Sequence, residues 1–168
     1  MTNLTNHATG PASPTTRTII GGARRTAEAI VSATATAESG FVRFQTAEAH
    51  QRREGVFLGI FAMVNTLAWD GRLTADQDAF RRTTNQWFNE NMPLPTEVNP
   101  ALYSEAHLQS AAWFKRTAAQ QLARIPGYLE ILDEVGVGWH AIITDDPGPI
   151  LYEDDFQVIT AVCPPPET

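Results

Sequence analysis

Cysteine, lysine and long apolar runs are all scarce in this chain. Cys163 is the single cysteine and Lys115 the single lysine among 168 residues. One thiol cannot form an internal disulfide or a cysteine-based zinc cluster, which favours a reducing compartment. The longest uncharged apolar run, residues 55–69, is shorter than the roughly 20 residues that a membrane-spanning helix needs. The sequence therefore predicts a cytoplasmic protein that does not associate with a membrane.

Motifs that carry chemistry are missing as well. The sequence has no HxH or HExxH pair, no calcium-loop spacing and no glycine-rich phosphate loop. It also lacks the Gly-x-Ser-x-Gly turn that presents a nucleophilic serine. It therefore predicts no metal site and no cofactor, and it indicates no catalytic residue.

Basic residues are absent from the C-terminal quarter of the chain, which is rich in carboxylates. Residues 125–168 contain no lysine or arginine, whereas the whole chain has a net charge of -7. The acids of this stretch are Glu130, Asp133, Glu134, Asp145, Asp146, Glu153, Asp154, Asp155 and Glu167. Such a surface repels nucleic acid and attracts basic surfaces. The expected partner is a basic protein surface, and nucleic acid is disfavoured.

The chain divides into three parts by composition. Residues 1–38 are rich in threonine and alanine and contain no aromatic residue, which predicts a flexible leader with a transient helix over residues 22–37. Residues 39–163 have the length and apolar content of one domain. Residues 164–168 are predicted to be a disordered tail.

Apolar spacing predicts the helices of this domain. Residues 55–69 are expected to form a central helix packed on several sides. Thr74 and Gln77 have the spacing of a capping box that opens the next helix, in which Arg81, Arg82 and Asn85 are expected to face away from the core. A third helix is expected over residues 104–124, capped by Ser104, and a short fourth helix begins at Pro126.

Short runs of residues, one of them with alternating apolar and polar side chains, predict the strands. Residues 41–46 and 139–144 read as strands, and residues 150–162 read either as two strands or as one strand with a bulge at Asp154 and Asp155. The predicted fold class is α+β, with about four helices packed on a small, mostly antiparallel sheet. In this sheet the strand near residues 41–46 pairs with the C-terminal strands.

Several segments carry a resemblance to a known group of proteins. The runs GIFAMVNTLAWDGRLTADQ, NPALY, AAWFKRTA, PGYLEILDEVGV and DDPGPILYEDDFQV are similar to those of a family of small actinobacterial proteins without a known activity. The resemblance covers roughly residues 41–162. It implies the same domain boundaries and brings no catalytic residue, cofactor or partner.

The candidate binding residues are Trp113, Lys115, Glu153, Asp155 and Gln157. On a helix over residues 104–124, Trp113 lies at the border of the apolar stripe, where a tryptophan can form an interface or line a pocket. On a strand, Glu153, Asp155 and Gln157 share one face. The first hypothesis is a non-enzymatic interaction or regulatory protein that binds its partner through the acidic end of the sheet. The alternative is a small hydrolase or transferase with a pocket near Trp113 and the face of residues 153–157.

Overall fold

The structure of the chain is a computed structural model that describes residues 15–20, 27–35, 39–51, 55–103 and 110–161. Within these ranges six strands form one sheet in the order β1-β4-β2-β3-β6-β5, and each neighbouring pair is antiparallel. The strands are β1 (Thr16–Ile20), β2 (Phe41–Thr46), β3 (Ala111–Lys115), β4 (Trp139–Thr144), β5 (Ile150–Glu153) and β6 (Gln157–Thr160). The predicted α+β class and the pairing of β2 with a C-terminal strand, β4, are confirmed.

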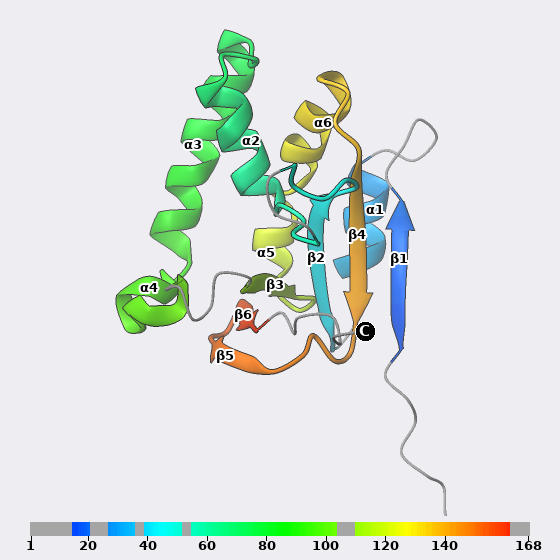
Figure 1. Ribbon diagram of the computed structural model, residues 1–168, viewed down its shortest axis with the longest axis vertical. Helices are drawn as coiled ribbons and strands as arrows, with labels where there is room; N and C mark the ends of the chain where they lie inside the picture. Colours follow the sequence, from blue (N-terminus) through cyan, green and yellow to red (C-terminus); the bar gives the residue numbers. More distant parts are fainter. Residues whose placement is uncertain (1–14, 21–26, 36–38, 52–54, 104–109, 162–168) are drawn as a thin grey trace, which may run out of the picture.

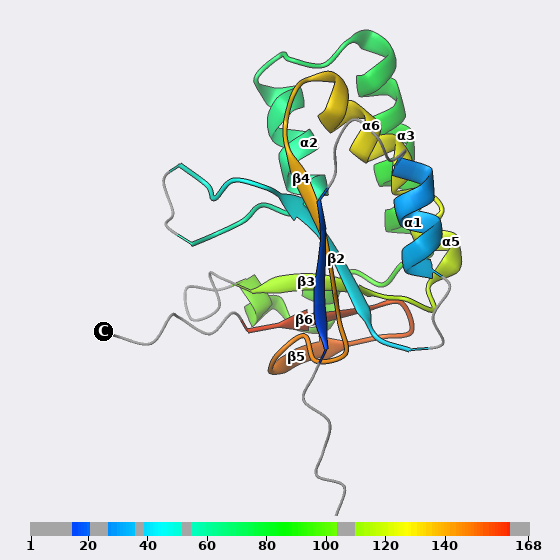
Figure 2. The same ribbon diagram turned by 90° about the vertical axis from the view of Figure 1, so that its right-hand side faces the viewer.

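The sheet turns sharply between β2 and β3. Strand β2 pairs with β4 along its whole length but with β3 at two positions, Phe41 with Lys115 and Val42 with Phe114. Further along β2, Gln45 forms a bridge to Gly59 instead. Figure 2 shows β3 and β6 running across the direction of β2 and β4. The sheet therefore has two parts, β1-β4-β2 and β3-β6-β5, which join at the start of β2.

The helices of the described residues are α1 (Ala27–Ala35), α2 (Ile60–Trp69), α3 (Ala75–Asn91), α4 (Pro95–Val98), α5 (Ala119–Leu122) and α6 (Pro126–Glu134), with a 3-10 helix η1 (Pro100–Tyr103). The main helices that pack with the β1-β4-β2 part are α1, α2 and α6 (Figure 1). Helices α1 and α6 lie side by side on one face of this part (Figures 1 and 2), and α2 packs on α6 and β2. Among the described residues, none of the helices has the length and apolar character needed to cross a membrane.

Local sequence explains the boundaries of α2 and α3. The central helix begins at Ile60 because residues 56–59 are extended and Gly59 bridges to β2, so the predicted start at residue 55 is wrong. Helix α2 buries Ile60, Val64 and Leu67 and leaves Trp69 exposed at its end. It packs on α6, β2 and α3, as the prediction of a helix packed on several sides requires. The capping box is confirmed, since the Thr74 hydroxyl accepts from the Gln77 amide and the Gln77 side chain accepts from the Thr74 amide.

The helix predicted over residues 104–124 is wrong. Ala111–Lys115 form β3, the segment turns at residues 116–117, and a single helical turn, α5, follows. The alanines of this segment favour a helix locally, but β3 lies between β2 and β6 and its backbone groups bond to both. Ser104, the expected cap, lies outside the described residues.

Residues 1–38 were predicted to be a flexible leader. This prediction is wrong for the two stretches that form regular structure, β1 and α1. Strand β1 pairs with β4 along five positions, and α1 buries Ala27, Ile30, Val31 and Thr34 in the main core. Small and β-branched side chains are enough to bury this face of the helix, because α1 lies close against α6. Residues 1–14, 21–26 and 36–38, like the predicted tail at 164–168, lie outside the described ranges.

The last strands form a hairpin. Residues 150–162 contain two strands, β5 and β6, which settles the alternative that the sequence left open. Asp154 holds the turn, because its Oδ1 accepts from the backbone amides of Phe156 at 2.7 Å and Gln157 at 3.0 Å. This turn therefore sets the position of Gln157, the first residue of β6.

Candidate functional site

A pocket of about 390 Å³, partly open to solvent, lies where the two parts of the sheet diverge. Strand β3, the helices α2 and α3 and the segment between α3 and α4 form its walls. Most of the lining is apolar and includes Ile60, Phe61, Phe88, Met92, Leu94 and Phe114. Ligand sites of small molecules have this volume and this mostly apolar lining.

Three aromatic rings form the apolar wall. The ring centroids of Phe61 and Phe88 are 5.0 Å apart, and that of Phe114 lies 6.1 Å from Phe61 and 6.2 Å from Phe88. Phe61 and Phe88 meet edge to face, an arrangement that aromatic rings prefer. The wall therefore offers ring faces and edges to a bound molecule.

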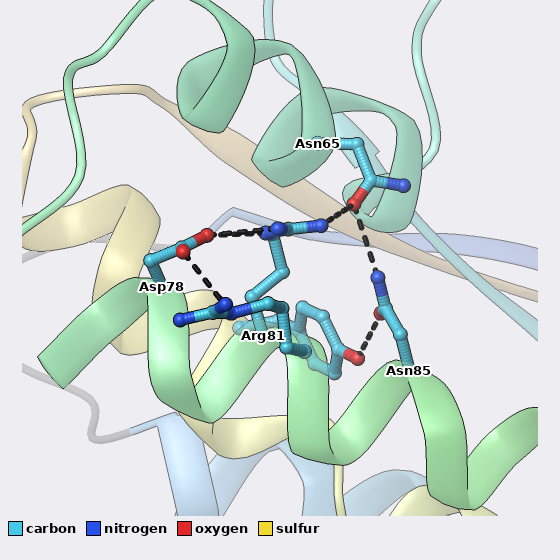
Figure 3. A network of polar contacts seen from close by, with 6 residues as sticks. Asn65, Asp78, Arg81 and Asn85 are labelled. Carbon is cyan, nitrogen blue, oxygen red and sulfur yellow. Dashed lines mark hydrogen bonds and ion pairs between the residues drawn. The ribbon is translucent and has the colours of Figure 1, made fainter. Parts of the chain in front are cut away.

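A network of amides and charges links α2 to α3 (Figure 3), and two of its members line the pocket. Arg81 donates to Asp78 at 2.8 Å and, through Nη1, to the Oδ1 atom of Asn65 at 3.1 Å. Asn85 donates to the same Asn65 oxygen at 3.0 Å and accepts a 2.6 Å bond from the hydroxyl of Tyr128. Asn65 and Asn85 both line the pocket, so this network sets the direction of their side chains.

The network corrects the expected orientation of α3. Arg81 and Asn85 were predicted to face away from the core, but both are partly buried and bond to α2. Arg82 does point outward, with its side chain 68% exposed. One signal in the sequence indicated this site, since Asn65 interrupts the otherwise apolar run of α2.

Gln157 forms the opposite end of the pocket. Its Nε2 donates to the carbonyl of Pro93 at 3.1 Å and to the carboxylate of Asp154 at 3.0 Å. These bonds tie β6 to the segment between α3 and α4. Gln157 is almost fully buried and lines the pocket.

Arg43 spans the place where β2 and β3 separate. Its Nε donates to Gln45 Oε1 at 2.8 Å, its Nη1 to the Ala112 carbonyl at 3.0 Å and its Nη2 to the Phe57 carbonyl at 3.0 Å. These carbonyls belong to β3 and to the loop before α2, so one guanidinium joins three segments. Arg43 also borders the pocket.

Three of the five residues predicted as a site lie on the other face of the sheet. Side chains alternate along β3, so Trp113 and Lys115 point away from the face of Phe114. The Trp113 indole donates to Thr160 at 3.2 Å, and the Lys115 ammonium pairs with Glu153 at 2.7 Å. Trp113 is nonetheless among the residues that line the pocket, and it does so from a strand, so its predicted position on a helix is wrong.

The two remaining predicted residues lie apart from that group. Gln157 points into the pocket, and Asp155 is exposed in the turn between β5 and β6. The prediction that Glu153, Asp155 and Gln157 share one strand face is wrong, because a turn separates β5 from β6.

Several acids of the C-terminal region serve the protein's own turns. Asp154 accepts four hydrogen bonds, from the hydroxyl of Tyr152, the amides of Phe156 and Gln157 and the side chain of Gln157. Asp146 accepts from the amide of Gly148. With Glu153 paired to Lys115, fewer carboxylates are available to a basic partner than the sequence suggests.

Two tyrosines near the pocket have perturbed hydroxyls. Burial raises the pKa of Tyr128 far above its usual value, and the positive charge of Arg81 offsets this in part. Burial and the hydrogen bond to the Asp154 carboxylate raise the pKa of Tyr152 to about 12. Both hydroxyls are therefore protonated donors at neutral pH. In the described part of the chain, no three His, Cys, Asp or Glu side chains converge as metal ligands.

Comparison of the chain with models of known protein families, with curated proteins and with solved structures gives no match.

Proposed function

We propose that this protein binds a small, largely apolar molecule in the pocket between α2, α3 and β3. The observation that carries the proposal is the combination of an aromatic wall with polar groups at both ends, Asn65 on one side and Gln157 on the other. Apolar walls supply most of the affinity of such sites, and a few placed polar groups supply orientation.

The lining favours binding over catalysis. The described residues of the pocket include no Ser, Cys, His, Asp, Glu or Lys. A hydrolase or transferase needs a nucleophile or a general base within hydrogen-bond distance of its substrate. The amides of Asn65, Asn85 and Gln157 can orient a ligand but cannot take up a proton at neutral pH.

The acidic end supports a second role less well. Asp145 and Asp155 are exposed, but Glu153, Asp146 and Asp154 already have partners within the chain. Exposed single charges contribute little to affinity. We therefore rank the binding of a basic protein surface below ligand binding as a proposed function.

A blocking variant tests the proposal. Ala112 lines the pocket and is exposed, so Ala112→Trp should fill the space without opening the core. We expect the uncharged probe 2-acetylnaphthalene to bind the wild type with a Kd on the order of 0.1 mM. The variant should weaken this affinity at least tenfold, as measured by calorimetry and by NMR shifts of pocket residues.

Asp155→Lys is the matched control, because Asp155 lies outside the pocket. It should bind the probe as the wild type does, and both variants should melt near the wild-type temperature. Unchanged binding by Ala112→Trp would contradict the pocket as the site. Capture of a basic protein by the wild type that Asp155→Lys abolishes would favour the acidic end.

A further inference from the structure

The side-chain amide of Asn65 is fixed in one orientation. A guanidinium has no acceptor, so the Asn65 atom that meets Arg81 must be the oxygen. The same oxygen accepts from Asn85, whose own oxygen is held by the hydroxyl of Tyr128. The Nδ2 group of Asn65 therefore points away from the network, as Figure 3 shows, and it has no hydrogen-bond acceptor among the described residues. Asn65 lines the pocket, so its Nδ2 is the donor that it can offer to a ligand there.

The amide of Gln157 is fixed in the opposite sense. Its nitrogen bonds to the carbonyl of Pro93 and to the carboxylate of Asp154, and neither of these can donate. The Oε1 atom is thus left without a donor among the described residues, and Gln157 lines the pocket. Gln157 presents an acceptor.

The two groups lie at opposite ends of the aromatic wall. Asn65 meets α3 at Asn85, whereas Gln157 meets the chain at Pro93, beyond the end of α3 at Asn91. The helical part of this path, from Asn85 to Asn91, is about 9 Å long. Phe61 and Phe88 belong to the helices between these levels, and Phe114 pairs with Gln157 across β3 and β6. The described lining lacks a carboxylate that could hold a cation, and the three nitrogens of its cation, Arg43, already donate to Gln45, Ala112 and Phe57.

We infer that the ligand is an elongated, uncharged aromatic molecule with a hydrogen-bond acceptor at one end and a donor at the other. The acceptor, such as a ketone, meets Asn65 Nδ2, and the donor, such as a phenolic hydroxyl, meets Gln157 Oε1. This inference rests on the proposed function and adds the chemical class of the ligand. Neither amide can turn to suit the reverse polarity, because turning it would break two hydrogen bonds of its own network.

A matched series of naphthalenes tests the inference. 2-Acetyl-6-hydroxynaphthalene carries both groups, 2-acetyl-6-fluoronaphthalene lacks the donor, and 2-ethyl-6-hydroxynaphthalene lacks the acceptor. The wild type should bind the first compound about tenfold more tightly than either of the others, because each comparison loses one hydrogen bond to a fixed partner. Calorimetry measures the three affinities.

Two variants assign each preference to its residue. Asn65→Asp keeps an oxygen for Arg81 and Asn85 but replaces the donor with an acceptor, so the preference for the ketone should disappear while that for the hydroxyl stays. Gln157→Leu should remove the preference for the hydroxyl alone. Thermal melts establish that each variant is folded, and if Gln157→Leu does not fold, the fluoro and hydroxy compounds compared on the wild type still test the donor.

The outcomes separate this inference from the proposed function. Equal binding of all three naphthalenes that Ala112→Trp abolishes would overturn the inference and leave the pocket as a binding site. Preferences that persist in both Asn65→Asp and Gln157→Leu would also overturn it. No binding of any of the compounds to the wild type would overturn both proposals.

Discussion

Tyr128 links the core to the pocket through one hydroxyl. Its side chain is fully buried, and its ring packs on Phe61 at 4.8 Å and on Phe80 at 5.3 Å. The hydroxyl donates to Asn85, which orients Asn65 in turn. The sequence around Tyr128 gave no indication of this polar partner on α3.

Tyr128→Phe should change how stability depends on pH. Because burial raises the folded pKa of Tyr128 above the unfolded value near 10, the protonated hydroxyl contributes fully below pH 10, and its contribution is lost as pH rises above 10. This loss is up to about 1.4 kcal/mol per pH unit. The variant should be less stable by about 1–2 kcal/mol at pH 7, because Asn85 loses its donor. It should also have a shallower alkaline decline in urea unfolding at pH 7 to 11.

Tyr152→Phe is the control for that decline. The pKa of Tyr152 is raised to about 12, so this residue also favours the folded state at neutral pH and loses that contribution above pH 10. Its side chain is partly exposed on β5 and lies outside the core cluster. If Tyr128→Phe keeps the full alkaline decline and Tyr152→Phe removes it, the assignment to Tyr128 is wrong.

At the scale of elements, α1 decides whether the N-terminal region belongs to the fold. Ile30 is 2% exposed within the core cluster, whereas Ser32 on the same helix is exposed. Ile30→Ala should lower the free energy of unfolding by about 2–4 kcal/mol through lost burial and a residual cavity. Ser32→Ala should change it by less than about 0.5 kcal/mol. Urea denaturation of both variants checks this, and equal stabilities would show that α1 does not pack on the domain.

Elements with a periodic signal of their own could be predicted from the sequence. The capping box of Thr74 and Gln77 located the start of α3, and alternation located β2. The strand predicted over residues 139–144 is β4. Strand β3 could not be found in this way, because Ala111 and Ala112 are weak strand formers and the strand is held by its neighbours β2 and β6. Strand β1 likewise depends on a partner more than 100 residues away, β4.

The candidate site was predicted only in outline for the same reason. The alternative hypothesis placed a pocket near Trp113 and the face of residues 153–157. Trp113 and Gln157 line the pocket, whereas Glu153 and Asp155 are not part of its lining. The residues that complete it, Arg43 and Asn65, come from β2 and α2, which meet β3 only in the folded chain. No local sequence pattern indicates contacts between segments that are distant along the chain.

For the whole molecule, the junction between the two parts of the sheet is the point on which pocket and fold both depend. Arg43 bridges it through the hydrogen bond to the Ala112 carbonyl of β3, and it also donates to Gln45 on its own strand and to the Phe57 carbonyl before α2. A lysine cannot reproduce this planar set of donors, so Arg43→Lys should be less stable by about 1–3 kcal/mol in urea unfolding. Amide exchange of β3 should quicken, because its link to β2 loosens. Arg82→Lys is the control: Arg82 contacts Asp78 at the surface, so the change should stay within about 0.5 kcal/mol. Equal effects of the two substitutions would show that β2 and β3 are held together without this guanidinium.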